Sequence, residues 1–369
     1  MPDTTINSGA RSSNQAVDPV RVGVLGAGLI AQAAHFESCT KAHNATLFAI
    51  CDVAEDLVRR AAIMHGATRT YTAYEAMLDD PDIDAVIIAT ADSFHVPASI
   101  QALRAGKHVL CEKPVATSVE EAEELNETVA RSGKVFRVGH MKRFDPGLQA
   151  ARRFIETEMG EMVALKAWYC DSTHRYTMTD ALHPPIITSE RSRKPASNPK
   201  EDLRRYYLLA HGSHLVDTAR FLGGDVSTIQ ARLSERAGMK CWFIDVEFAS
   251  GAMGHLDLTV AVRMDWHEGF HIYGQHGSIT GKTYNPWYFK SSDVEIFHEA
   301  DATARRPLGA DGHFFRRQVE AFADAIRGKS ETVGATVKDG VASVRALAAI
   351  ARSVDSGQPI DLASVSGEV

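Results

Sequence analysis

A glycine-rich segment near the N-terminus has the residue types and spacing that bind a dinucleotide. Gly26-Ala27-Gly28-Leu29-Ile30-Ala31 forms a G-x-G-x-x-A motif directly after the apolar run 20–25. Gly26 allows a tight turn, Gly28 lets the backbone approach a pyrophosphate, and Ala31 lets the following helix pack closely. The pyrophosphate would rest on free N–H groups at the helix start, next to Leu29 and Ile30. A glycine-rich turn can be purely structural, but the strand before it and the helix after it favour a cofactor site.

Asp52 indicates which dinucleotide would bind. It ends the second apolar run and follows Gly28 by about 24 residues, close to the spacing of an acidic ribose ligand. A carboxylate there accepts hydrogen bonds from an adenosine ribose diol and repels a 2′-phosphate. The neighbours Cys51 and Val53 offer no cation for such a phosphate. The sequence therefore predicts NAD, with NADP the less favoured cofactor.

Polar residues follow the next two apolar runs, where a parallel sheet would place them beside this motif. Thr90 and His95 follow the run 84–89, and Glu112 and Lys113 follow the run 108–111. Ligands of open α/β sheets bind outside the carboxyl ends of the strands. We expect these four residues near the cofactor, with Lys113 where a nicotinamide and a substrate hydroxyl meet. The alternative for Lys113 is an ordinary surface lysine in a salt bridge.

A histidine-containing segment in the second half of the chain could handle a proton. It runs His211-Gly212-Ser213-His214-Leu215-Val216-Asp217. Oxidation of a secondary alcohol needs a group that polarises the oxygen and a base that titrates near neutrality, and lysine and histidine meet those needs. His214 could also be a satisfied core histidine. The H-x-x-H-x-x-D spacing is compatible with a metal, but it lacks an identified third convergent ligand, so we expect no metal.

The elements that position these residues fall into two domains. Residues 1–19 are polar and predict a flexible tail. Residues 20–142 alternate Val/Ile-rich runs with helical stretches, which is typical of a doubly wound, Rossmann-type parallel sheet. Residues 143–369 contain a helix, seven strand-like runs in succession and two final helices, which predict an α+β domain with an open, mainly antiparallel sheet. The irregular stretch 171–205 is a candidate lid or an oligomer contact.

Together, these motifs resemble the glucose-fructose oxidoreductase and inositol dehydrogenase family (Gfo/Idh/MocA). The resemblance rests on the glycine motif, on the segment from Ala89 to His95, on Glu112-Lys113-Pro114, on the segment from Gly212 to Asp217, and on Asp339-Gly340 and the final helix before Ile360. It implies that Lys113 polarises the substrate oxygen and that His214 is the base. It also implies a sugar, sugar derivative or cyclic polyol as substrate, and a homo-oligomer formed through the exposed face of the second sheet.

The sequence departs from the family pattern at Ala210, where an aspartate usually stands four residues before the histidine. An alanine can neither orient an imidazole nor stabilise its charge. The candidates to replace the aspartate are His211, Tyr206, Tyr207 and Asp217, the last by its i+3 position on a helix.

Several polar residues could line a sugar pocket, but each could equally be an ordinary surface residue. The candidates are Lys142, Arg143, His174, Arg175, Tyr207, His211, Arg263, Trp266 and His267. Residues 188–205 hold six Lys and Arg against three Asp and Glu. This surplus raises the hypothesis of a loop that closes over an acidic substrate, against the alternative of a solvated charge run.

Composition excludes other classes of protein. The chain has 369 residues and a formal net charge of −7, which argues against nucleic-acid binding because that needs a cationic surplus. No apolar run approaches a membrane span and the N-terminus lacks a signal-peptide pattern, so we expect a cytoplasmic protein. Five widely spaced cysteines suggest neither a disulfide framework nor a zinc site.

Three functions fit these patterns. The first is an NAD-dependent dehydrogenase that oxidises a ring secondary hydroxyl. The second is redox-neutral glycoside cleavage, in which the sugar is oxidised transiently, the aglycone is eliminated and the hydride returns. The third is a non-catalytic NAD-binding regulator, which the presence of Lys113 and His214 disfavours.

Overall fold

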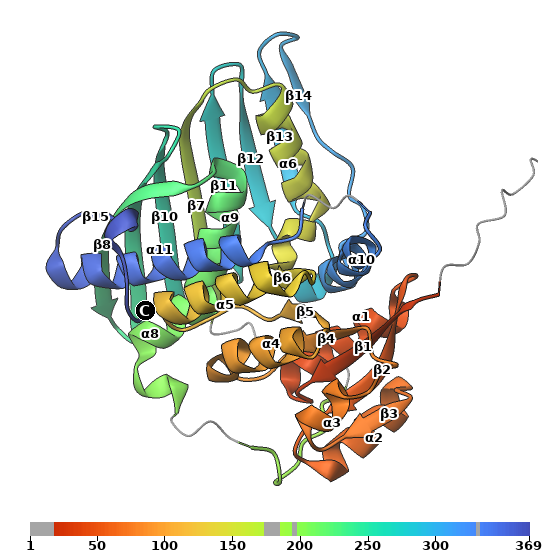
Figure 1. Ribbon diagram of the computed structural model, residues 1–369. Helices are drawn as coiled ribbons and strands as arrows, with labels where there is room; N and C mark the ends of the chain where they lie inside the picture. Colours follow the sequence, from red (N-terminus) through yellow and green to blue (C-terminus); the bar gives the residue numbers. More distant parts are fainter. Residues whose placement is uncertain (1–17, 173–184, 194–197, 330–332) are drawn as a thin grey trace, which may run out of the picture.

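The first domain is built on a six-stranded parallel sheet (Figure 1). The computed structural model describes residues 18–172, 185–193, 198–329 and 333–369. The strand order is β3-β2-β1-β4-β5-β6, the order of a dinucleotide-binding fold whose two halves meet at β1 and β4. The strands are β1 (Val20–Leu25), β2 (Ala45–Cys51), β3 (Arg69–Tyr71), β4 (Ala85–Ile88), β5 (His108–Cys111) and β6 (Phe136–Val138). The predicted doubly wound sheet is confirmed.

Helices cover both faces of this sheet, which is why its central strands are continuous apolar runs. Val22, Val24 and Ile87 are fully buried. The helical elements are η1 (Ala31–His35), α1 (Phe36–Lys41), α2 (Glu55–His65), α3 (Tyr74–Leu78), η2 (Asp92–Phe94), α4 (His95–Arg104) and α5 (Val119–Ser132). The expected single helix after the glycine motif is divided: η1 is a π turn that continues into α1.

The second domain contains a nine-stranded sheet in the order β14-β13-β12-β11-β7-β10-β9-β8-β15. Its strands are β7 (Met162–Ser172), β8 (Val226–Arg236), β9 (Met239–Phe248), β10 (Met253–Val262), β11 (His267–Gly274), β12 (Gly277–Thr283), β13 (Asp293–His298), β14 (Thr303–Arg305) and β15 (Ile360–Asp361). All neighbouring strands run antiparallel except β7 and β10, which pair in parallel. The expectation of a mainly antiparallel sheet is therefore confirmed.

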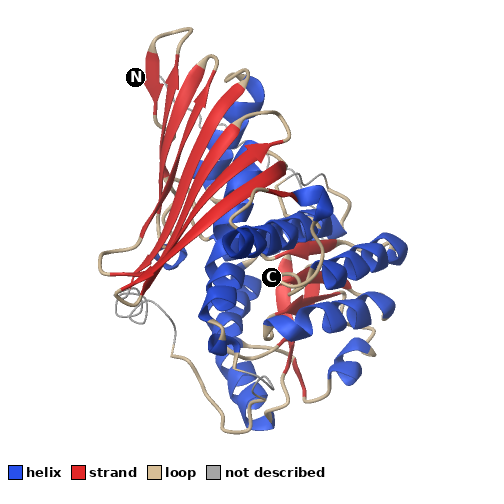
Figure 2. Cartoon of the chain, turned by 90° about the vertical axis from the view of Figure 1, so that its left-hand side faces the viewer, coloured by secondary structure: helices blue, strands red, loops and turns tan. Residues whose placement is uncertain are grey.

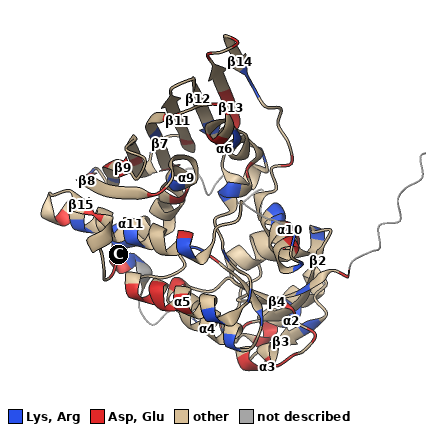
Figure 3. Cartoon of the chain, turned by 45° about the horizontal axis from the view of Figure 1, so that its top comes forward, with Lys and Arg blue, Asp and Glu red and all other residues tan. Residues whose placement is uncertain are grey.

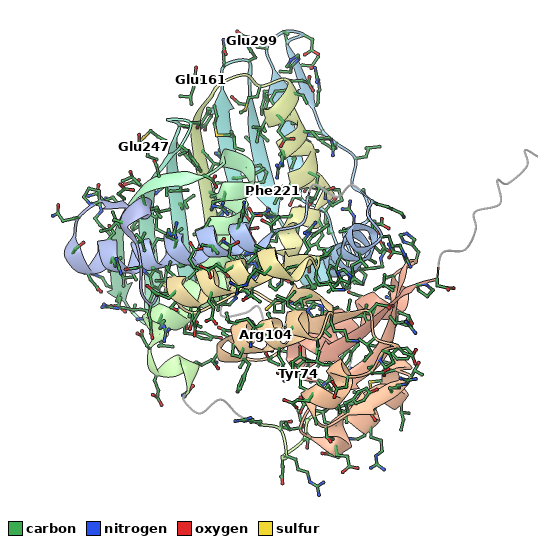
Figure 4. All side chains as sticks on the ribbon, viewed as in Figure 1. Tyr74, Arg104, Glu161, Phe221, Glu247 and Glu299 are labelled. Carbon is green, nitrogen blue, oxygen red and sulfur yellow. The ribbon has the colours of Figure 1, made fainter. Side chains whose placement is uncertain are left out.

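Helices cover only one face of the large sheet (Figure 2). They and the short turns of this half are η3 (Met141–Phe144), α6 (Pro146–Thr157), η4 (Pro199–Glu201), α8 (Leu203–Tyr207), η5 (Leu208–Gly212), α9 (Ser213–Gly223), η6 (Pro286–Tyr288), α10 (Phe314–Ile326), α11 (Val337–Ser356) and η7 (Leu362–Ser364). On the bare face, Phe243, Met253, Tyr273 and Phe297 are exposed. Glu161, Glu247 and Glu299 lie toward the end of the sheet away from the first domain (Figure 4).

Two late helices return to the first domain. On α10, Val319, Phe322 and Ala323 are buried in the same core as the strands β1 and β2. The side chain of Asn44, just before β2, donates to the backbone oxygen of Glu320 at 2.9 Å. Helix α11 packs along α5, and both helices lie together in Figure 1. The boundary at Lys142 follows the order of the chain and stays a prediction, because α10 completes the core of the first domain.

Charge is distributed unevenly over the described residues. Figure 3 shows acidic side chains gathered along α5, whose sequence contains five glutamates between 120 and 127. In the part of the chain that the structure describes, no helix has the length and apolar character to cross a membrane.

Candidate active site

A cavity of about 780 Å³ lies between the carboxyl ends of the parallel strands and the second domain. Its polar wall contains residues predicted from the sequence, and its other wall is largely aromatic. The lining residues include Leu29, Ile30, Thr90, His95, Glu112, Lys113, Tyr169, Tyr206, Ala210, His211, His214, Trp266, Trp287 and Phe315. The structure therefore brings the glycine motif, the lysine and the two histidines to one place.

The glycine loop has the geometry of a phosphate cradle. Gly26 has a φ of 97°, and a Cβ on it would lie 2.5 Å from the backbone oxygen of Ala89. A Cβ on Gly28 would meet nothing within 4 Å. The first glycine is thus required by the turn, whereas the second leaves open space above the backbone. Leu29 is exposed beside it. These are the features that a pyrophosphate needs, so the loop fits NAD.

The carboxylate of Asp52 holds the glycine loop in place through hydrogen bonds to the backbone. Its Oδ2 accepts a hydrogen bond from the backbone N–H of Ala27 at 3.0 Å, and its Oδ1 accepts one from Ala54 at 3.0 Å. The carboxylate is partly exposed at the end of β2. Each carboxylate oxygen has a second lone pair, so the same group can also accept hydrogen bonds from a ribose diol.

Glu112 is buried and ion-paired. Its Oε1 lies 2.8 Å from Nε2 of His35, a residue of the π turn η1, and its Oε2 accepts from the backbone N–H of Lys113 at 3.1 Å. The bond to His35 and the charges of His35 and Lys113 outweigh burial, and they lower the pKa of Glu112. This pair ties the end of β5 to the glycine loop and orients the backbone at Lys113.

His95 ties the ends of two strands together. Its Nδ1 lies 2.7 Å from the backbone oxygen of Pro114, and its Nε2 lies 3.2 Å from the backbone oxygen of Thr90. The ring is buried at 1% exposure while still touching the cavity. The structure thus places His95 as a support of the cofactor end of the cavity, with Thr90 beside it.

Lys113 reaches across the cavity to the second domain. Its Nζ donates to the backbone oxygen of Ala210 at 3.1 Å. Ala210 lies in η5, a π turn inserted between α8 and α9, and π turns occur frequently at functional sites. At the position where an aspartate was expected, a main-chain carbonyl therefore holds the lysine.

His214 lies on the cavity wall at the start of α9. Its ring stacks on that of Tyr169, with centroids 6.0 Å apart and planes at 2°. Burial, followed by the charges of Lys113 and Lys142, keeps the pKa of His214 well below that of free histidine. The imidazole is therefore neutral at physiological pH and retains a lone pair.

His211 has a carboxylate partner, whereas no ion pair with a carboxylate is found for His214 among the described residues. Its Nε2 lies 3.4 Å from Oδ2 of Asp171, and its Nδ1 lies 3.3 Å from the hydroxyl of Tyr169. Tyr207 packs on its ring at a centroid distance of 5.7 Å. Of the four candidates to replace the aspartate, His211 is the one placed at the cavity with an acidic partner.

Asp217 does not orient His214, contrary to one of the four alternatives. It accepts hydrogen bonds from Nε and Nη2 of Arg143, the shortest at 2.6 Å, and Arg143 also pairs with Asp339 at 3.0 Å. The guanidinium of Arg143 also lies 5.3 Å from the ring centroid of Phe221. His211, His214 and Asp217 do not converge, and within the described ranges no cluster of three His, Cys, Asp or Glu could hold a metal.

Two predicted substrate residues are buried behind the cavity instead of lining it. Arg143 belongs to the ion pairs just described. Lys142 forms a close ion pair with Glu268, and its Nζ lies 4.5 Å from the ring centroid of Tyr169. Both side chains are about 95% buried, so their partners account for their position and a sugar cannot reach them directly.

The other predicted substrate residues are scattered. Arg204 and Arg205 pair with Glu235 and Glu368, so these two cations point away from the cavity. Arg263 donates to the backbone of Ala237. His267 stacks on Trp168, outside the cavity residues. Tyr207 packs on His211, and among the described members of the proposed set His211, His214 and Trp266 line the cavity. His174 and Arg175 lie outside the described residues.

The aromatic wall was largely missed from the sequence. Trp287 stacks on Phe315 at 5.3 Å, and Tyr206 and Trp266 complete the wall. Trp266 was predicted as a substrate residue and Tyr206 as a possible replacement for the aspartate, whereas Trp287 and Phe315 were not predicted. The available signal for Trp287 was its turn, Asn285-Pro286-Trp287, in which Asn285 caps η6. No spacing rule connects such a turn to a distant cavity.

A short segment, residues 185–193, crosses from the cavity to the outside of the first domain; we call it the strap. The side-chain amide of Gln32 donates to the backbone oxygens of Ala27 at 2.7 Å and Ile187 at 2.8 Å, and its oxygen accepts from Ile187 N–H at 2.8 Å. Farther along, Ser189 donates to Asp56 at 2.7 Å. The strap is thus fastened to the glycine loop and to α2.

We expect Gln32→Ala to accelerate NADH release by about fivefold or more, because two neutral hydrogen bonds to the strap contribute about 1–2 kcal/mol together. Stopped-flow fluorescence of NADH displacement measures this rate. Gln101→Ala is the matched control, since Gln101 also forms a side-chain bond, to Glu75, but on the exposed side of α4. An unchanged release rate in Gln32→Ala would show that the strap does not retain the cofactor.

Comparison with known proteins agrees with this geometry. Residues 20–140 match the family described as "Oxidoreductase family, NAD-binding Rossmann fold", and residues 148–280 match "GFO/IDH/MocA C-terminal domain". The chain is 28% identical to inositol 2-dehydrogenase 2 of Saccharopolyspora erythraea over 356 residues, covering 93% of this chain and 96% of that protein. It is 27% identical to 1,5-anhydro-D-fructose reductase of Ensifer adhaerens over 311 residues, covering 82% and 86%.

The fold is also that of a solved relative. The structure of levoglucosan dehydrogenase with NADH and levoglucosan superposes with a TM-score of 0.75 at 22% identity, covering 94% of this chain and 100% of that one. The two family matches together span most of the chain, from the glycine loop through the strands of the second sheet. The predicted resemblance is therefore confirmed, and the chain belongs to the Gfo/Idh/MocA family of NAD-binding oxidoreductases.

Proposed function

We propose that this oxidoreductase oxidises a ring secondary hydroxyl of a sugar, a sugar derivative or a cyclic polyol. The observation that carries the proposal is the placement of Lys113 Nζ, His211 and His214 in one cavity that opens beside the glycine loop. The names of its relatives, inositol dehydrogenase and anhydrofructose reductase, support this substrate class.

The residues of the cavity have separate tasks in this reaction. Bound NAD supplies the hydride acceptor. The ammonium group of Lys113, held by the carbonyl of Ala210, donates a hydrogen bond to the substrate oxygen and stabilises the negative charge that develops there. His214 is neutral because of its depressed pKa, so its lone pair can accept a hydrogen bond from the substrate hydroxyl and orient it.

The aromatic wall supports a ring-shaped substrate. Tyr206, Trp266 and Trp287 add aromatic surface to the same cavity as the polar residues. A sugar or cyclitol ring offers C–H groups to such a surface and hydroxyls to the polar side, so the cavity can fix which hydroxyl faces Lys113.

A panel of sugars, cyclitols and chromogenic glycosides tests the function. NADH formation at 340 nm and aglycone release are followed together, which separates net oxidation from redox-neutral cleavage. We expect stoichiometric NADH with at least one ring polyol or sugar. Aglycone release with catalytic NAD and no NADH accumulation would overturn the dehydrogenase proposal, and absence of hydride transfer with every compound would favour a regulator.

We expect kcat/KM with NADH or NAD to exceed that with the phosphorylated cofactor by at least tenfold. The carboxylate of Asp52 lies where a 2′-phosphate would approach, and the repulsion between the two anions opposes binding. Steady-state kinetics with both cofactors on the best substrate of the panel measures the ratio. More efficient use of NADPH would show that the carboxylate does not set the preference.

The bare sheet face supports the expected homo-oligomer. Phe243, Met253, Tyr273 and Phe297 are each 40% exposed or more on that face, and exposed apolar side chains gathered on one surface favour association. Sedimentation velocity measures the state, and a monomer at micromolar concentration would contradict this part of the proposal.

A further inference from the structure

The proposed reaction releases a proton, and the surroundings of His214 are poorly suited to keep it. In the described part of the chain, His214 forms no ion pair with a carboxylate, and its charged neighbours Lys113 and Lys142 oppose protonation. Ala210 removes the aspartate that the family pattern places one turn earlier. A proton accepted in this cavity therefore needs a second group that can hold a positive charge.

A buried polar chain starts at the same cavity wall. The hydroxyl of Tyr169 lies 3.3 Å from Nδ1 of His211, and Nε2 of His211 lies 3.4 Å from Oδ2 of Asp171. Tyr169 is 2% exposed, and His211 and Asp171 are each 7% exposed. Tyr169 and Asp171 are two residues apart on β7, so both point to the same face of the sheet, toward the π turn that carries His211.

The order of groups is phenol, imidazole, carboxylate. In such an order the carboxylate fixes the tautomer of the imidazole and stabilises the imidazolium that forms when the outer hydroxyl gives up its proton. The π turn matters here because it sets His211 and Ala210 side by side, so the imidazole faces β7 while the Ala210 carbonyl faces Lys113.

We propose that His211, held by Asp171 and linked to the cavity through the hydroxyl of Tyr169, replaces the missing aspartate and holds the proton released by substrate oxidation. The proposal rests on the proposed function, because it needs an alcohol presented to Lys113. It adds a proton acceptor that the family motif does not contain.

The proton balance is simple. The substrate O–H proton passes to the oxygen of Tyr169 as the Tyr169 proton passes to Nδ1 of His211, and Nε2–H of His211 donates to Asp171. The electron pair of the substrate O–H bond becomes the second bond of the carbonyl as the hydride leaves carbon for the bound nicotinamide. Reduction of a carbonyl reverses each transfer.

Several elements surround His211. Tyr169 and Asp171 face it from β7, and Tyr207 and His214 belong to its own helical run. Two cations lie nearby: Lys113 at the end of β5, and Lys142 against the ring of Tyr169. The apolar side chains of Leu258 and Leu347 pack against Gly212. Asp171 is the carboxylate within 3.4 Å of the His211 ring, so its removal should have the largest electrostatic effect on the imidazole.

The test is the pH dependence of kcat/KM for oxidation in Asp171→Asn. The wild-type profile has an acid limb, because the base must be unprotonated to accept the proton. Removing the negative charge of Asp171, which lies 3.4 Å from the ring, destabilises the imidazolium and lowers the pKa of His211 by about 1 unit or more. We expect the acid limb of Asp171→Asn to move to lower pH by that amount, with a lower plateau, and Asp171→Glu to restore part of the shift.

Tyr169→Phe and Tyr207→Phe form a matched pair, since both rings pack on His211 and only Tyr169 has a hydroxyl placed on its ring nitrogen. We expect Tyr169→Phe to lower kcat/KM for oxidation by about 100-fold, the scale of a lost acid–base group, and Tyr207→Phe to stay within about threefold of wild type. Equal small effects of the two variants would overturn the relay.

A titration of the apo protein separates this inference from the proposed function. The ring-nitrogen NMR signals of His211, assigned with His211→Asn, should titrate at lower pH in Asp171→Asn than in wild type, whatever the substrate is. If Asp171→Asn changes neither the pH of the acid limb of kcat/KM nor the NMR titration of His211, and only His214→Asn moves the acid limb, the inference is wrong. If no sugar or polyol supports hydride transfer while the NMR shift appears, the function is wrong and the dyad remains.

Discussion

Lys113→Met lowers kcat by about 1000-fold while the Kd for NADH changes by less than about threefold. Loss of a group that stabilises charge or moves a proton in the transition state costs 10²–10⁴ in rate, and methionine keeps the length of the side chain without its charge. In the proposed reaction Lys113 meets the substrate through Nζ, whereas the glycine loop is built by other residues. Steady-state kinetics and fluorescence titration of NADH measure the two quantities.

The control for this variant is Lys338→Met, an exposed lysine at the start of α11. It should retain wild-type kinetics and stability. A Lys113→Met protein that binds NADH normally and also turns over near the wild-type rate would show that the lysine does not polarise the substrate.

Gly28→Ala weakens NADH binding at least tenfold without changing the thermal stability of the apo protein. A Cβ at this position meets nothing within 4 Å, so the folded chain accommodates it. The same methyl group occupies the space in which a pyrophosphate approaches the backbone. Fluorescence titration with NADH and differential scanning calorimetry of the apo protein give the affinity and the Tm.

Gly26→Ala provides the contrasting result in the same loop. Its φ of 97° is strained for alanine, at a cost of about 1–2 kcal/mol, and its Cβ would lie 2.5 Å from the oxygen of Ala89. We expect the Tm to fall by several degrees in addition to the loss of affinity. A Gly28→Ala protein that binds NADH as wild type does would contradict the assignment of the loop as the pyrophosphate site.

The fold could be predicted where strands and helices are long and periodic. The strands β1, β4 and β5 are rich in Val, Ile and Leu because helices cover both sheet faces, and the alternation in β9 and β10 reflects one covered face. Short elements were not predicted from the sequence: β3 has three residues and α3 has five, which are too few to show a hydrophobic period. The π turns η1 and η5 were not predicted because their residue types do not distinguish them from an α-helix.

The candidate site could be predicted where its residues stand at the carboxyl ends of parallel strands. Thr90, Glu112 and Lys113 come directly after strands, so the parallel topology alone brings them together. Lys142 and Arg143 were expected at the substrate, whereas the structure buries them in ion pairs with Glu268 and Asp217, which lie far along the chain and are brought near only by the fold. Asp171 was missed for the same reason: its role depends on how β7 faces the turn at His211.

The carbonyl that holds Lys113 has an electrostatic consequence. A carboxylate at position 210 could form an ion pair with the ammonium group, whereas the oxygen of Ala210 orients that group through a dipole and carries no net charge. The nearby carboxylate of Glu112 is already engaged by His35. The cavity therefore offers an incoming alkoxide a stronger positive potential, and it does so through a main-chain atom that no side-chain substitution at position 210 can delete.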